Sequence, residues 1–147
     1  MRNWLAKKNW LWLLLAGAGL VAACDSVEPG IRIEQAWIRP DPLMENAAGY
    51  LVIHNDGSEP DALTGVRVSF SEGAMLHQSV MEGDVHRMEH VDRLELPPGR
   101  MVEFRPLSYH VMMMGLQRNL EIGEKATFTL IFDVAGEVRV EAEVRAE

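Results

Sequence analysis

Methionine and histidine are the side chains in this 147-residue sequence best suited to metal chemistry, because both offer neutral donor atoms to soft metal ions. The chain has nine Met and five His, and most of the Met residues lie between Met75 and Met114. Taken singly, a methionine is usually a core residue and a histidine a polar surface residue. A site is therefore predicted only where spacing brings several of them onto one face.

One such spacing occurs in residues 74–90, which predict a β-hairpin closed by the two-residue turn Gly83-Asp84. In this register, three pairs of residues project from one face of the hairpin: His77 with His90, Ser79 with Met88, and Met81 with His86. His77 and Met88 are then diagonal neighbours, with backbones about 7–8 Å apart, a separation that two converging ligand side chains can close.

A second pair, His110 and Met112, lies two residues apart on a predicted strand, so both side chains project to the same side. The spacing leaves open whether the two pairs face each other. If they do, two imidazoles and two thioethers converge, a soft set suited to Cu(I) and poor for Mg²⁺ or Ca²⁺, which prefer oxygen. Thioethers form no disulfides, so such a site can work in an oxidising compartment.

Residues 1–23 have the pattern of an export signal, with basic residues, an apolar stretch and a small-residue end before Cys24. Cys24 is the only cysteine, which excludes an internal disulfide and any multi-cysteine metal site. The segment Val21-Ala22-Ala23-Cys24 resembles the lipobox of bacterial lipoproteins. That resemblance implies cleavage before Cys24 and its acylation, with enough chains for stable membrane anchoring.

The alternative for this segment is a secreted protein cleaved by an ordinary signal peptidase, which would also accept Val-Ala-Ala. Asp25 resembles the signal that keeps some lipoproteins in the inner membrane, so we expect an anchor on the periplasmic side of that membrane. Residues 24–30 are then a tether, and residues 31–147 form a single domain.

The charge of the chain argues against nucleic acid as a partner. The formal net charge is −8, and removal of residues 1–23 takes away three basic residues and no acidic ones, which leaves 11 basic and 22 acidic residues. The mature part, at −11, lacks the basic surface that phosphate binding requires.

Alternating apolar and polar residues predict an all-β domain. Residues 127–134 and 137–145 alternate with a period of two around Ala135-Gly136, which predicts a terminal hairpin. Runs of similar character predict further strands at 31–39, 48–54, 62–69, 74–81, 101–105 and 109–116. Several short strands at this spacing indicate a sandwich or a small barrel.

The four candidate ligands also carry a family resemblance. Ten residues separate His77 from Met88, twenty-one separate Met88 from His110, and one separates His110 from Met112. This spacing is similar to that of the ligands in the periplasmic copper chaperones called PCu(A)C. The likeness extends through Ala47–Asn55, Tyr109–Leu116 and the final hairpin. It implies a cupredoxin-like antiparallel fold and one Cu(I) per chain, held by His77, Met88, His110 and Met112.

The same resemblance implies a copper-accepting partner, a cytochrome c oxidase subunit or assembly factor, and delivery by ligand exchange rather than catalysis. Two features depart from some members of that family. Gln78 stands where they have a second methionine, and the chain stops at Arg145-Ala146-Glu147 without a tail rich in His and Met. We therefore expect one copper site and no tail site.

Three alternatives remain. The first is a copper buffer or resistance protein without a dedicated acceptor, and the second is an interaction module without metal. The third is a zinc metallopeptidase, because His86-Arg87-Met88-Glu89-His90 matches the H-x-x-E-H pattern. That chemistry needs a helix, since on a strand His86 and His90 are about 13 Å apart. Methionine is also rarely a ligand of zinc in proteins.

The other notable residues receive simpler interpretations. Strand parity predicts that Met113 is a core residue and that Met114 shares the ligand face. His86 and His90 are predicted to be surface residues or spare ligands, and His54 structural. Packing or rim positions are predicted for Met75, Met81 and Met101, and core positions for Trp37, Phe104, Phe128 and Phe132.

Overall fold

The computed structural model describes residues 30–146, which contain strands and turns but no helix, and hence no helix able to cross a membrane. The all-β prediction is confirmed for this part of the chain. The predicted signal segment 1–23, the acylated Cys24 and most of the tether 24–30 lie outside the described residues.

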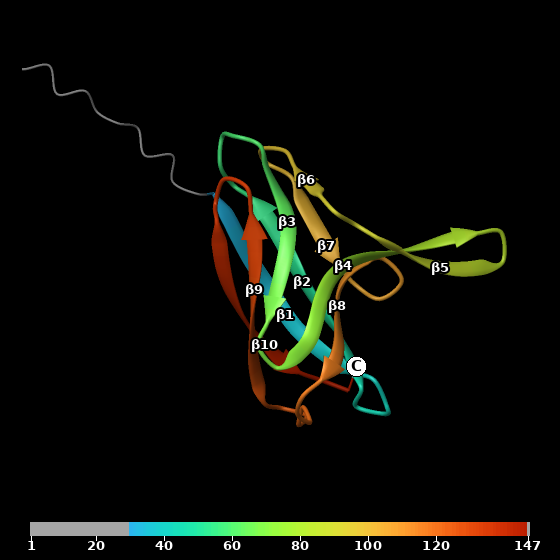
Figure 1. The fold of residues 1–147 in the computed structure, drawn as a ribbon. Helices are drawn as coiled ribbons and strands as arrows, with labels where there is room; N and C mark the ends of the chain where they lie inside the picture. Colours follow the sequence, from blue (N-terminus) through green and yellow to red (C-terminus); the bar gives the residue numbers. More distant parts are fainter. Residues whose placement is uncertain (1–29, 147) are drawn as a thin grey trace, which may run out of the picture.

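Ten strands make up the fold (Figure 1). In chain order they are β1 (Ile31–Pro40), β2 (Asn46–Asn55), β3 (Asp61–Val68), β4 (Ser71–Glu82), β5 (Val85–His90), β6 (Leu94–Leu96), β7 (Met101–Phe104), β8 (Tyr109–Leu116), β9 (Lys125–Phe132) and β10 (Glu137–Val144).

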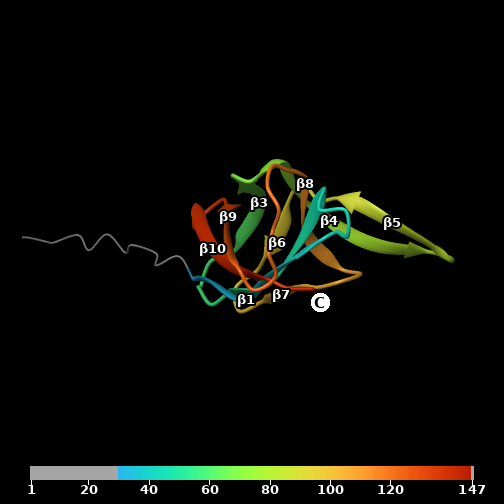
Figure 2. The ribbon, with the colours of Figure 1, turned by 90° about the horizontal axis from the view of Figure 1, so that it is seen from below.

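The strands form one sheet in the order β5-β4-β8-β7-β2-β1-β10-β9-β3-β6, with a further pairing between β8 and β2. The sheet folds round so that side chains from both halves meet in one core (Figures 1 and 2). The largest fully buried side chains include Ile38, Leu51, Leu63, Met113 and Phe128. The β4–β5 hairpin is the exception, because it projects away from this body in both views.

The predicted terminal hairpin is confirmed. Strands β9 and β10 pair antiparallel, with Val140 opposite Phe128 and Ala142 opposite Ala126, and these four side chains are buried. The polar residues between them along β10 are exposed. The period-two pattern thus corresponds to one face on the core and one in water.

The prediction for Trp37 is wrong. The register of β1 against β2 shifts between Glu34 and Trp37, and Gln35 in this bulge has a φ of 52°. A bulge adds one residue and reverses which side chains point inward. Ile38 therefore takes the buried position, and Trp37 is only partly buried and stacks on Tyr50, with ring centroids 4.5 Å apart. Phe104, Phe128 and Phe132 are buried as predicted.

The register predicted for the β4–β5 hairpin is confirmed. His77 lies opposite His90, Ser79 opposite Met88, and Met81 opposite His86, and Glu82 and Val85 flank the Gly83-Asp84 turn. Residues 85–90 form a strand, so the helix that a metallopeptidase motif requires is not present there. The sequence analysis also missed β6, a three-residue strand whose buried Leu94 and Leu96 pair with β3.

Replacement of Met113 tests the parity of β8. Met113 is fully buried in the core, whereas its neighbour Met114 is half-buried on the other face. We expect Met113→Ala to lower the free energy of unfolding by about 2–5 kcal/mol, because a buried cavity is left behind. Met114→Ala should cost about 1 kcal/mol or less. Urea denaturation of the metal-free protein measures both, and equal losses would contradict this assignment.

Candidate metal centre

Strand β4 places one histidine between two others. It pairs with β5 on one side and with β8 on the other, so His77 lies directly opposite both His90 and His110. The ring centroids of His77 and His90 are 6.0 Å apart, and those of His77 and His110 are 5.7 Å apart. Three imidazoles therefore form a row across three adjacent strands.

The two predicted methionine ligands lie one row to either side of this line of histidines. Met88 is opposite Ser79 on β4, and Met112 is opposite Met75. Because directly paired residues and residues two apart share a face of a sheet, His77, Met88, His110 and Met112 all project to one side. The structure thus brings together on neighbouring rows the two pairs that the sequence analysis could not place relative to each other.

The opposite face of the same strands fixes them to the core. Leu76, Val111 and Met113 are at most 2% exposed and belong to the main hydrophobic cluster. Met113 is therefore a core residue, as strand parity predicted, and Met114 lies on the face that carries His110. The apolar side of β4 and β8 holds the donor side in a defined register.

Exposure rises across the four candidate ligands. His110 is 4% exposed, His77 and Met112 are half-buried, and Met88 is 66% exposed on the projecting hairpin. One side of the centre is therefore fixed in the body of the domain, and the other is open to solvent.

A carbonyl oxygen orients the ring of His110. His110 Nδ1 lies 3.1 Å from the Ser108 carbonyl oxygen, which also accepts the Ser79 backbone N–H at 3.0 Å. A carbonyl can only accept, so Nδ1 carries the proton and Nε2 keeps its lone pair. Histidine ligands of metals commonly donate their second nitrogen in this way. His110 is thus held in the tautomer that a metal ligand needs.

His77 has a buried nitrogen without a partner. Its Nδ1 is buried and makes no hydrogen bond in the metal-free chain. An unsatisfied buried polar atom costs about 1–3 kcal/mol, and such atoms are rare in proteins. The site's donor chemistry therefore fits a soft metal ion bound by the imidazole.

Carboxylates do not dominate this face. In the part of the chain that the structure describes, no group of three or more His, Cys, Asp and Glu could hold a metal ion on its own. The nearest acidic contact of the row joins His90 Nε2 to Asp92 Oδ1 at 3.0 Å. The other donors beside the row are the thioethers of Met88 and Met112.

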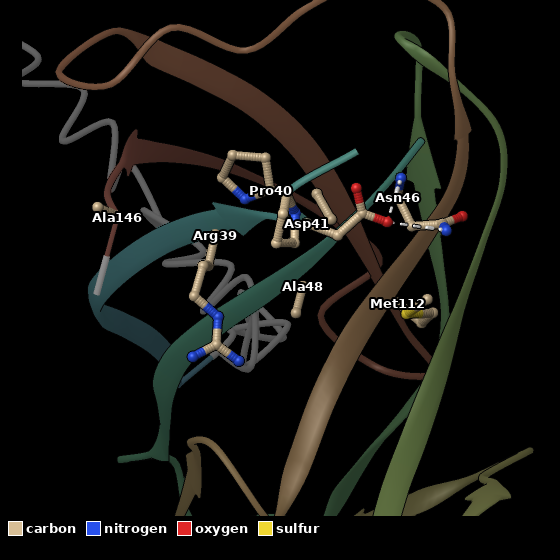
Figure 3. Close-up of a pocket in the computed structure, with 9 residues that line it drawn as sticks. Arg39, Pro40, Asp41, Asn46, Ala48, Met112 and Ala146 are labelled. Carbon is tan, nitrogen blue, oxygen red and sulfur yellow. Dashed lines mark hydrogen bonds between the residues drawn. The ribbon is translucent and has the colours of Figure 1, made fainter. Parts of the chain in front are cut away.

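A cavity of about 410 Å³ lies beside Met112. Figure 3 shows Met112 and Asn46 on one side of it and Arg39 on the other, with Asp41 and Ala48 between them. Asp41 is held by the Asn46 side-chain amide at 3.1 Å, and Arg39 donates to the Tyr50 hydroxyl at 3.1 Å. Sequence reasoning missed this cavity, because residues from β1, β2 and β8 and Ala146, which follows β10, meet there only in the fold.

Two further residues lie near the centre. Met75, predicted to be a packing or rim residue, lies directly opposite Met112 on the ligand face. Ser108 carried no signal of its own, because it acts through its backbone carbonyl. His54 lies away from the row, on β2, where its Nε2 contacts Glu34 at 3.1 Å.

Burial lowers the pKa of the His77 imidazole below its ordinary value of 6.5, and the neighbouring His110 and His90 lower it further. A neutral ring has a lone pair for a metal at mildly acidic pH, where a free histidine is half protonated. In the metal-free protein we expect His77 to titrate below 6.5 in a ring NMR titration.

The lowered pKa of His77 also determines how the free energy of unfolding changes with pH. Since the unfolded chain takes up the proton first as the pH falls below about 6.5, protonation of His77 lowers the free energy of unfolding in acid, and this effect fades above that pH. His90→Gln removes one like charge and should move the His77 midpoint upward. A His77 midpoint at or above 6.5 would contradict the burial argument.

Solved structures with the same fold are known. The copper-bound PCuAC domain from PmoF2 is 29% identical, with a TM-score of 0.66, and the match covers 80% of this chain and 94% of that domain. The CuI-DR1885 protein of Deinococcus radiodurans is 25% identical, with a TM-score of 0.67, and the match covers 85% of this chain and 84% of that protein. The predicted likeness to the cupredoxin-like fold of PCu(A)C proteins is confirmed.

Relatives in sequence carry lipoprotein names. "Putative lipoprotein Lxx21020" of Leifsonia xyli is 28% identical over 104 residues, which are 70% of this chain and 62% of that protein. The chain spans about three fifths of the length of the curated relatives it matches. A family model described as "Putative lipoprotein LpqE-like" matches residues 31–144, and the chain therefore belongs to the LpqE-like family.

Proposed function

We propose that this chain is a lipid-anchored, extracytoplasmic copper chaperone that carries one Cu(I) bound by His77, Met88, His110 and Met112. The observation that carries the proposal is the arrangement of these four residues on one face of β5, β4 and β8. Structures of PCuAC domains that share the fold are described as copper-bound or as CuI forms, which supports copper as the cargo.

The donor set suits a carrier better than a store of permanently bound metal. All four ligands are neutral, and none is a thiolate, which is the strong ligand of blue-copper electron carriers. Copper held by imidazole and thioether groups can exchange one ligand at a time with an acceptor. The Cu(I) ion is released chemically unchanged, so the proposal includes no catalytic step.

The gradient of exposure suggests the order of exchange. Met88 is 66% exposed and projects on a hairpin, so an acceptor reaches it first. His110 is 4% exposed, with its tautomer fixed by the Ser108 carbonyl, so it holds the cargo longest. Met112 is also open to the cavity beside it, which offers an acceptor side chain a second approach.

The fold orients the site relative to the proposed anchor at Cys24. The start of β1 and the β4–β5 hairpin lie on opposite sides of the domain in both views (Figures 1 and 2). A tether over residues 25–30 reaches at most about 20 Å when extended. In this proposal the domain stays near the membrane, and the hairpin that carries Met88 lies on the side of the domain away from the anchor.

The acceptor in this proposal is a cytochrome c oxidase subunit or assembly factor, as the resemblance to PCu(A)C proteins implies. The mature chain carries 22 acidic and 11 basic residues, so an acceptor with a basic docking face would associate faster at low salt. We propose the periplasmic side of the inner membrane as the location.

A competitive titration tests the copper site. The chain from residue 25 onward, which lacks Cys24, is titrated with Cu(I) against a chromophoric chelator under reducing conditions. We expect each chain to take one copper from the chelator, and a loss of affinity of about 100-fold or more in Met88→Ala/Met112→Ala, because both sulfur donors are removed.

Met101→Ala is the matched control. Met101 is 58% exposed on β7 and lies opposite His54, at the other end of β2 from Ala48, which pairs with Met112, so its removal should leave the affinity unchanged. Failure of the wild-type chain to compete for Cu(I), or equal losses in the control and the double variant, would overturn the proposal.

A further inference from the structure

The two faces of the β4–β5 hairpin carry side chains of different chemical types. On one face, the three cross-strand rows from the base to the tip are His77 with His90, Ser79 with Met88, and Met81 with His86. The rows on the other face are Gln78 with Glu89, Val80 with Arg87, and Glu82 with Val85. All the soft donors lie on one side of the hairpin and all its paired charges on the other.

The proposed chaperone site uses only part of the donor face. His77 and Met88 belong to it, whereas Met81 and His86 lie beyond them at the tip. Met81 is 61% exposed, and His86 is also exposed, so neither side chain packs in the core. Burial of apolar surface therefore does not explain a methionine and a histidine placed directly opposite each other.

We propose that the hairpin tip is a second, weaker Cu(I) site formed by Met81 and His86 with Met88 as a shared third donor. Directly opposite residues have Cβ atoms about 4.5–5.5 Å apart, so the Met81 sulfur and a His86 nitrogen can reach one ion. Met88 is two residues from His86 on β5 and diagonal to Met81 across the hairpin. Its thioether can thus serve either the tip or His77.

The donor types favour Cu(I) at the tip. Thioether and imidazole ligands are soft and neutral, and a d¹⁰ ion imposes no geometry that two or three donors would fail to meet. The charged side chains near the tip do not compete for the metal ion. Glu82 and Arg87 lie on the other face of the hairpin, where they pair with each other at 3.1 Å. With fewer donors, all of them exposed, the tip binds more weakly than the inner site.

This inference rests on the proposed function for the inner site, and one experiment separates the two. The chain from residue 25 onward, with ¹³C-labelled methionine methyl groups, is titrated with Cu(I) under anaerobic conditions. The Met112 methyl reports the inner site, and the Met81 methyl reports the tip. We expect Met112 to shift during the first equivalent and Met81 to shift beyond it.

Two variants decide whether the tip site is specific. His86→Gln should raise the copper concentration needed to shift Met81 about tenfold, since one donor is lost. The control Val80→Leu/Arg87→Gln changes the neighbouring row on the other face and should leave the Met81 response unchanged. A Met81 methyl that does not shift in the wild type, or that responds equally in His86→Gln, would overturn the tip site. A Met112 methyl that does not respond would overturn the inner site instead.

Discussion

The pairing of β4 with β5 on one side and β8 on the other determines where every donor atom of the proposed site lies. His77 is the common member, since it pairs directly with both His90 and His110. A slip of one residue in either pairing would turn the ligands of that strand to the opposite face. The buried side chains Leu76, Val111 and Met113 prevent such a slip between β4 and β8, because it would expose them to water, and the two-residue turn at Gly83-Asp84 sets the register of β4 with β5. The core thus holds the donor face in register without contributing a ligand.

The same register explains how one site can be both selective and open. Its inner part is rigid, with His110 buried and oriented by the Ser108 carbonyl and with an unpartnered His77 nitrogen available to a ligand. Its outer part is carried on a hairpin that leaves the body of the domain, where Met88 is mostly exposed. In the proposed function, the inner histidines define the place of the copper ion, and the outer thioether gives an acceptor access to it.

Local patterns predicted much of this arrangement, and long-range contacts supplied the rest. The two-residue turn at Gly83-Asp84 fixed the hairpin register, and strand parity placed Met113 in the core. No turn joins β4 to β8, so the meeting of His77 with His110 depends on how the whole sheet pairs, which sequence spacing does not encode. The bulge near Gln35 displaced Trp37 for a similar reason. The position of Met75 opposite Met112 likewise followed only from the fold.

The central claim is that two imidazoles and two thioethers from these three strands bind one Cu(I). X-ray absorption at the copper edge of the loaded chain tests it most directly, because sulfur and nitrogen neighbours scatter differently. The account predicts a first shell that contains both nitrogen and sulfur, and a reduced sulfur contribution in Met88→Leu and in Met112→Leu. A first shell without sulfur in the wild-type chain, or one that neither substitution changes, would contradict it.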